Sequence, residues 1–422
     1  MAKTTDFDPY AGNLLTEGLG PLRSRPEVMA TLTKRPKVPQ SMDGIPRHIA
    51  LHMLMAVRDF HIPSLEECRL HETMELMVRQ NYRYLDPTAA QTWATVGGDK
   101  QALRPVRTPA YGAAVVGHSG TGKTAAISRC LESYPSQIVE HRSFPKLIGG
   151  HRQVVWLSID VPASGRAADL AMELMRAWDR ATGGDRFELD LATERRNGMK
   201  MLDSWRQVAS AHFLGILHLD EIQNLFKLPT LKQRNGKSRT TSRSELTIVE
   251  DQSLKWILTL MNTWQVPLLT SGTPDGMRAL TRRLSTTERI VTSGYHKFDP
   301  FENARDNGFR KNFLDQLGRY QFVQKKILVD DELAHLIIEL TAGIHRLIIA
   351  LWIAAQRIAL ERSTCELRLD DFKKAASTYL APVAPAVAAL RSGDPHRMTA
   401  YEDLLPSDGE FWSQFWVSVG RM

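Results

Sequence analysis

The chain has 422 residues, of which 43% are hydrophobic and 24% charged, a composition typical of a folded protein with apolar material for two or three domains. The formal net charge of +7 suits contact with phosphates but does not identify a partner. The three cysteines lie far apart with no CxxC pair, so neither a disulfide framework nor a zinc site is indicated. The polar start and the lack of an apolar run of roughly 18 residues predict no membrane partner and a cytoplasmic location.

The N-terminal part divides into two segments by composition. Residues 1–45 are rich in Pro, Gly, Lys and Arg and have no sustained period, which predicts an extended basic arm. Residues 46–108 are predicted to form a small helical module and a linker. Apolar residues recur at helical spacing from Arg47 to Tyr84, with a break near Pro63, and a polar stretch follows from Asp86.

Short apolar runs alternate with helical patterns over residues 109–300. Five buried strands separated by helices predict an α/β fold with a parallel, doubly wound sheet. We expect strands at 113–116, 154–159, 216–219, 267–270 and 289–292, and helices at 124–134, 167–182, 199–212 and 246–264.

From residue 301 onward the strands stop and the pattern becomes helical. Helical spacing at 309–320, 331–340, 345–361 and 370–380 predicts a helical lid over residues 301–381, followed by a tail at 382–422. Four aromatic residues lie between Phe411 and Trp416 in this tail. They form either a short peptide hook for a partner or a packed terminal helix.

A phosphate-binding pattern follows the first predicted strand. It matches G-x-x-x-x-G-K-[ST] and opens a helix, which is the context in which such a loop binds a nucleotide. Lys123 is expected to reach the β- and γ-phosphates of ATP, and the Thr124 hydroxyl is expected to bind Mg²⁺. The predicted loop consists of Gly117, His118, Ser119, Gly120, Thr121, Gly122, Lys123 and Thr124.

Two carboxylates end the third predicted strand, Ile-Leu-His-Leu-Asp220-Glu221. A strand that ends in Asp-Glu is a weak signal alone, because strand ends are often solvated. Together with the phosphate-binding loop it predicts that Asp220 holds Mg²⁺ and that Glu221 orients the attacking water. The expected activity is hydrolysis of ATP to ADP and phosphate.

Further catalytic groups are predicted by position. Three polar residues follow the fourth strand, where a side chain could sense the γ-phosphate: Thr270, Ser271 and Thr273. Thr273 is the chosen candidate, and a plain turn is the alternative. Arg282 and Arg283 lie where AAA+ ATPases, which this arrangement resembles, project an arginine finger into a neighbouring subunit. The alternative is a solvated basic helix face. Arg346, at the start of a lid helix, is the candidate for a second sensor arginine.

A basic run follows the Asp-Glu pair. Its Pro, Gly, Ser and Thr content predicts a loop, and its cations would neutralise duplex phosphates without reading sequence. The alternative is a solvated charged loop. Arg166, after the second strand, is a further candidate DNA contact. The six cations of the run are Lys227, Lys232, Arg234, Lys237, Arg239 and Arg243.

The chain resembles TnsC, the AAA+ regulator of TnsABC-type bacterial transposons, to which the shorter TniB is related. The matching stretches are residues 117–124, 154–160, 219–224, 266–274 and 382–393. The resemblance implies an ATPase that assembles with itself into a ring or helical filament on double-stranded target DNA. It also implies a target-selector partner of the TnsD/TniQ type, transposase partners of the TnsA/TnsB type, and disassembly driven by hydrolysis. Two alternatives are a motor or remodeller acting on nucleic acid and a signalling ATPase that never touches it.

Overall fold

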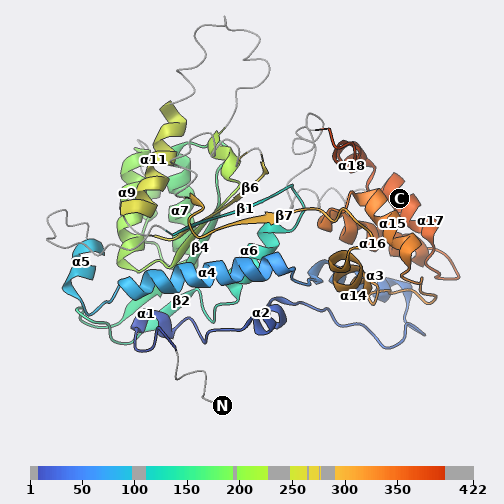
Figure 1. Ribbon diagram of the computed structural model, residues 1–422, viewed down its shortest axis with the longest axis horizontal. Coiled ribbons are helices and arrows are strands. Elements are labelled where there is room, and N and C mark those ends of the chain that lie inside the picture. The colour runs from blue at the N-terminus through green and yellow to red at the C-terminus, as the bar shows by residue number, and fades with distance from the viewer. Residues whose placement is uncertain are drawn as a thin grey trace, which may run out of the picture. The chain divides into compact units, whose positions relative to one another are not determined.

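The computed structural model describes residues 8–96, 111–192, 197–226, 248–263, 266–274, 276 and 290–394. The chain forms two compact units (Figure 1). The first takes residues 1–28, 66–116 and 124–297, and the second takes residues 29–65, 117–123 and 298–422. Each unit therefore combines segments that are far apart in the sequence, which the composition-based segmentation did not anticipate.

A five-stranded parallel sheet forms the centre of the first unit, as predicted. Its order is β4-β5-β6-β1-β7. β1, β5 and β6 are buried at every position, which explains their continuous apolar runs. The fifth strand was predicted at 289–292, but it lies a few residues later. The strands are β1 (Gly112–Gly117), β4 (Trp156–Asp160), β5 (Ile216–Asp220), β6 (Leu268–Gly272) and β7 (Gly294–Phe298).

Helices lie on both sides of this sheet (Figure 1). The group α7 (Ala167–Thr182), α9 (Gly198–Ala211) and α11 (Ile248–Thr263) packs through an edge-to-face series of Trp178, Trp205 and Trp256. The other group contains α4 (Leu65–Tyr84) and α6 (Lys123–Glu132). Three short elements were not predicted: a hairpin of β2 (Ile138–His141) and β3 (His151–Val154), and the helix α8 (Glu188–Ala192).

The N-terminal segment differs from the predicted extended arm. It contains α1 (Leu14–Glu17) and α2 (Arg25–Leu32), and Tyr10, Leu15 and Leu19 are buried. The Asn13 side chain donates to the Tyr82 carbonyl at 2.8 Å, and the Gln153 side chain donates to the Leu15 carbonyl at 2.9 Å. These contacts hold residues 13–15 to the rest of the first unit. The predicted linker after Asp86 likewise contains a helix, α5 (Ala90–Val96).

The second unit is helical around one hydrophobic cluster. The central helix α16 (His345–Leu360) has nearly all its residues buried, and Leu54 and Val57 from the N-terminal part belong to the same cluster as Trp352. Part of the predicted N-terminal module thus shares its core with the predicted lid. The other elements are α3 (Arg47–Met55), η2 (Ala56–Asp59), η5 (Gly308–Leu314), α14 (Asp315–Leu317), α15 (Asp331–Thr341), α17 (Leu369–Thr378), η6 (Ala381–Val383) and α18 (Ala384–Arg391).

In the described ranges no single helix is long and apolar enough to cross a membrane. The pair α15 and α16 meets the length and composition criteria together but bends by 116°.

Candidate active site

The phosphate-binding pattern forms a loop between β1 and α6. Gly120 and Gly122 have φ angles of +83° and +96°, a backbone region that side chains with a Cβ rarely adopt. Lys123 is buried, and its Nζ donates to the Gly117 carbonyl at 2.8 Å and to the His118 carbonyl at 3.1 Å. The ammonium group therefore lies over its own loop, where it can turn toward a bound anion.

Arg346 contacts this loop within the second unit. Its backbone N–H donates to the Gly120 carbonyl at 3.1 Å, and its Nη2 lies 3.4 Å from the Ser119 hydroxyl. A Cβ added at Gly120 would lie 2.9 Å from Ile344 Cγ2, so a glycine is needed for this approach. The structure thus brings the predicted sensor arginine to the phosphate-binding loop.

Asp220 is the centre of a converging set of donors at the end of β5. Its carboxylate accepts from the Thr124 hydroxyl at 2.7 Å, the Ser271 hydroxyl at 2.5 Å and the Glu221 amide at 2.8 Å. Burial alone would raise the pKa of Asp220, but the nearby His218 and these hydrogen bonds outweigh it and lower the pKa. The side chain is therefore a buried, ionised carboxylate next to the hydroxyl of Thr124.

Glu221 has an unusual backbone and a tethered side chain. Its φ angle is +54°, which is strained for a residue with a Cβ, and its side chain is exposed. The Gln223 amide, in η3 (Ile222–Phe226), donates to the Glu221 carboxylate and accepts from the Thr273 N–H at 3.2 Å. Gln223 thereby joins the Asp-Glu strand end to the turn after β6.

That turn requires glycine because Gln223 packs against it. A Cβ on Gly272 would lie 2.6 Å from Gln223 Oε1, and one on Gly276 would lie 2.6 Å from Gln223 Cβ. The Thr273 hydroxyl accepts from the Gly276 N–H at 3.4 Å, so it is engaged within the turn. The β6 side chain that reaches Asp220 is Ser271, and the sensor role of Thr273 stays a prediction.

Sequence reasoning missed His218 and Ser158, and it considered Ser271 only as a possible sensor of the γ-phosphate. The His218 ring lies 2.7 Å from the Ser271 hydroxyl through Nε2 and 2.8 Å from the Ser158 hydroxyl through Nδ1. Ser271 and His218 are buried. The available signal was a histidine inside the otherwise apolar strand Ile-Leu-His-Leu, which suggests a partnered polar group.

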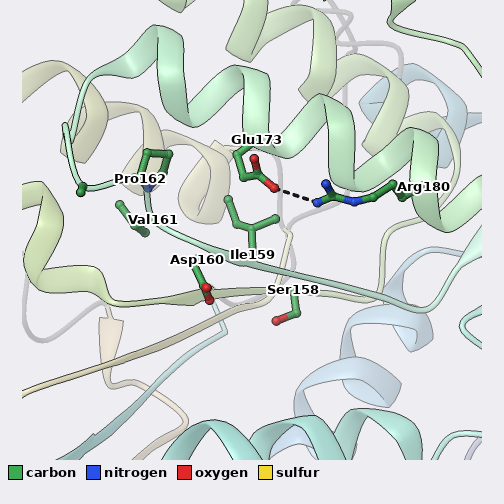
Figure 2. Close-up of a pocket in the computed structure, with 8 residues that line it drawn as sticks. Ser158, Ile159, Asp160, Val161, Pro162, Glu173 and Arg180 are labelled. Carbon is green, nitrogen blue, oxygen red and sulfur yellow. Dashed lines mark hydrogen bonds and ion pairs between the residues drawn. The ribbon is translucent and has the colours of Figure 1, made fainter. Parts of the chain in front are cut away.

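A second carboxylate lies beside Asp220. Asp160 on β4 is opposite Asp220 in the strand register, and burial raises its pKa, with smaller contributions from Asp220 and Glu173. Asp160 and Ser158 line a cleft of about 490 Å³. Figure 2 shows this cleft with the ion pair of Glu173 and Arg180, 2.7 Å long, on the neighbouring α7. Asp160 has no role predicted from the sequence.

The remaining predicted residues divide into those the structure describes and those it does not. Arg166 is exposed at the start of α7, and a Cβ on its neighbour Gly165 would lie 2.4 Å from the Asn224 carbonyl of η3. Arg166 is therefore close to η3, the element that precedes the basic run in the sequence. The candidate finger residues Arg282 and Arg283 lie outside the described residues, as do the six cations of residues 227–243.

Residues 107–281 match the model of a family described as AAA domain. This match contains the phosphate-binding loop, Asp220, Glu221 and the turn at Thr273. No curated protein matches the chain. The sheet, the loop and the family match together support a nucleotide-binding domain of the AAA type over these residues.

Proposed function

We propose that this chain is an ATP-hydrolysing molecular switch that assembles on double-stranded DNA when ATP is bound. The observation that best supports ATP binding and hydrolysis is the 2.7 Å hydrogen bond between Thr124 Oγ1 and Asp220 Oδ2. A hydroxyl at the start of the loop helix and an ionised carboxylate at the end of β5 are the two groups that an ATPase of this fold uses for Mg²⁺.

The residues fit Mg²⁺ by chemistry as well as position. Mg²⁺ prefers oxygen ligands and is usually held by one or two protein groups together with substrate phosphates. Asp220 offers a carboxylate, and the pKa of this group is lowered. Thr124 offers a hydroxyl oxygen. When bound, Mg²⁺ would supply charge neutralisation at the β- and γ-phosphates.

The other residues have distinct tasks in this proposal. Lys123 donates to the Gly117 and His118 carbonyls, and phosphate oxygens are stronger acceptors that would draw it away from them. Glu221 would orient the attacking water from the strand end where its positive φ holds it. Arg346, next to Ser119, would stabilise charge on the phosphates.

Three observations support DNA as the surface for assembly. The chain carries a net charge of +7. The basic run of residues 227–243 has no acidic residue. The exposed Arg166 belongs to a loop that contacts η3, after which the run begins. Lysine and arginine at such a place would neutralise phosphates with no preference for sequence.

The resemblance to TnsC supports a place in transposition. In that role the ATP-bound assembly would link a target-selector protein to the transposase, and hydrolysis would release it. A motor or remodeller would use the same nucleotide site. It differs in needing continuous hydrolysis, whereas the proposed switch needs ATP binding for assembly and hydrolysis for release.

Electron microscopy and ATPase measurements with and without duplex DNA test this proposal. We expect rings or filaments on DNA with a slowly hydrolysed ATP analogue, loss of these assemblies with ADP, and faster hydrolysis when DNA is present. No assembly on DNA with the analogue would contradict the switch, and assembly that persists in ADP would contradict release by hydrolysis.

The salt dependence of DNA binding tests the basic run. Each phosphate contact contributes about 0.9 to the slope of log affinity against log salt, so three Ala substitutions should flatten it by up to about 2.7. The variant is Lys232→Ala, Arg234→Ala and Lys237→Ala. The matched control removes three exposed cations of the second unit, Lys325, Lys326 and Lys374. Equal slopes for the parent and the test variant would place the DNA contact elsewhere, first at Arg166.

A further inference from the structure

A continuous set of hydrogen bonds crosses three strands of the sheet. Ser158 on β4 is opposite His218 in the strand register, and His218 and Asp220 are two residues apart on β5, so their side chains share one face. The contacts are 2.8 Å from Ser158 to His218, 2.7 Å from His218 to Ser271 and 2.5 Å from Ser271 to Asp220. We call these four side chains the β4–β6 relay.

The direction of the hydrogen bonds at Ser271 follows from the geometry. The Ser271 hydroxyl has one proton and donates it to the Asp220 carboxylate at 2.5 Å. Towards His218 the same hydroxyl can then only accept, which places a proton on Nε2 of the ring. The other ring nitrogen, Nδ1, lies 2.8 Å from the Ser158 hydroxyl at the outer end of the relay.

We propose that His218 is a positioning residue that fixes the Ser271 hydroxyl on Asp220 and so holds the carboxylate in the orientation needed for Mg²⁺. The inference rests on the proposed role of Asp220 as the residue that holds Mg²⁺. The Ser271 hydroxyl has one proton and donates it to Asp220. Ser271 therefore orients the carboxylate and does not donate to the nucleotide.

Burial explains why His218 matters. Ser271 has no exposed surface and His218 has 2%, so no water replaces a lost donor. Without the Nε2–H the Ser271 hydroxyl can rotate to another acceptor, and Asp220 then loses a hydrogen bond to a charged group. The outer end of the relay, Ser158, lines the cleft beside Asp160 (Figure 2).

Two amide substitutions separate the two ring nitrogens. A glutamine carries its amide nitrogen near the place of Nε2, whereas an asparagine carries it near the place of Nδ1. We therefore compare His218→Gln with His218→Asn and His218→Leu. The readout is binding of Mn²⁺, as a spectroscopic substitute for Mg²⁺, in the presence of ADP by electron paramagnetic resonance.

We expect the Leu and Asn variants to bind Mn²⁺ about tenfold more weakly, the scale of one lost hydrogen bond to a charged group, and the Gln variant to remain within about threefold of the parent. Affinity of ADP alone should be unchanged in all three. Equal losses for Gln and Leu would overturn the proposal, because a packing role does not distinguish the nitrogens.

Nitrogen-15 NMR of histidine in the parent protein, without nucleotide or metal, tests the proton arrangement separately. The signal that disappears in His218→Gln should report a proton on Nε2. An Nε2 without a proton would overturn the relay even if the protein binds and hydrolyses ATP. Absence of nucleotide binding by the parent would contradict the proposed function and leave this NMR result as the test of the relay.

Discussion

The stability of the second unit should fall when the pH drops below neutral because of His345. This residue begins α16 and packs between the rings of Phe301 and Phe313, at centroid distances of 4.2 Å and 5.3 Å. Burial, with a smaller contribution from the nearby His61, lowers the pKa of His345 to about 4. An unfolded histidine has a pKa of about 6.5.

The sign and size of the effect follow from these two values. Between about pH 6.5 and pH 4, His345 is protonated in the unfolded chain but not in the folded chain. The free energy of unfolding therefore decreases as the pH falls through this window. From the two pKa values the loss at pH 5 is at most about 2 kcal/mol. It is smaller to the extent that solvent reaches the partly exposed residue. Below about pH 4 this group causes no further loss.

The substitution His345→Phe removes the titrating group and keeps an aromatic ring in the site. The assay is hydrogen exchange of the α16 amides at pH 7 and pH 5, with parent and variant compared at equal pH so that intrinsic exchange cancels. We expect the parent to lose up to about 30-fold more protection than the variant between the two pH values. His335→Gln, at an exposed position of α15, is the control for removing a histidine. Equal losses in parent and His345→Phe would refute the reasoning.

Two further predictions concern nucleotide chemistry. Lys123→Ala should abolish ATP binding, measured by equilibrium dialysis, and with it assembly on DNA, because the charge that compensates the phosphates is lost; retained nucleotide-dependent assembly would contradict this. The double variant Arg282→Ala with Arg283→Ala should lower ATP turnover at unchanged ATP affinity. Mixed with Glu221→Gln protein it should recover part of that turnover, and no recovery at any mixing ratio would count against a finger shared between subunits.

Local signals in the sequence explain why much of the fold could be predicted. The helix predicted at 167–182 has those bounds in the structure, because its apolar face is regular and Gly183, with a φ angle of +63°, ends it.

The fifth strand was misplaced because Ile290, Val291 and Thr292 have high β-propensity. The actual strand, Gly294–Phe298, is a sheet edge with exposed positions, and the buried His296 on it pairs with Glu66 and Thr73 of α4.

The site was predictable where its residues are adjacent in the sequence. Residues 117–124 and the Asp220-Glu221 pair each form a contiguous motif, whose chemistry depends on local spacing. The contact of Arg346 with Ser119 joins residues 227 positions apart, and the bond from Ser271 to Asp220 joins residues 51 positions apart. Such pairs depend on the order of strands and the packing of helices, which no local pattern encodes.

A single-turnover ATPase assay with Glu221→Gln tests whether this site hydrolyses ATP with Glu221 as the residue that activates water. ATP binding and hydrolysis are measured in the same reaction, for the parent and the variant, with Mg²⁺ present. Glutamine keeps the shape of the side chain but cannot act as a base toward water. We expect equal ATP binding and a rate of hydrolysis lower by on the order of 100-fold. Hydrolysis at the parent rate, or no ATP binding by either protein, would contradict the account.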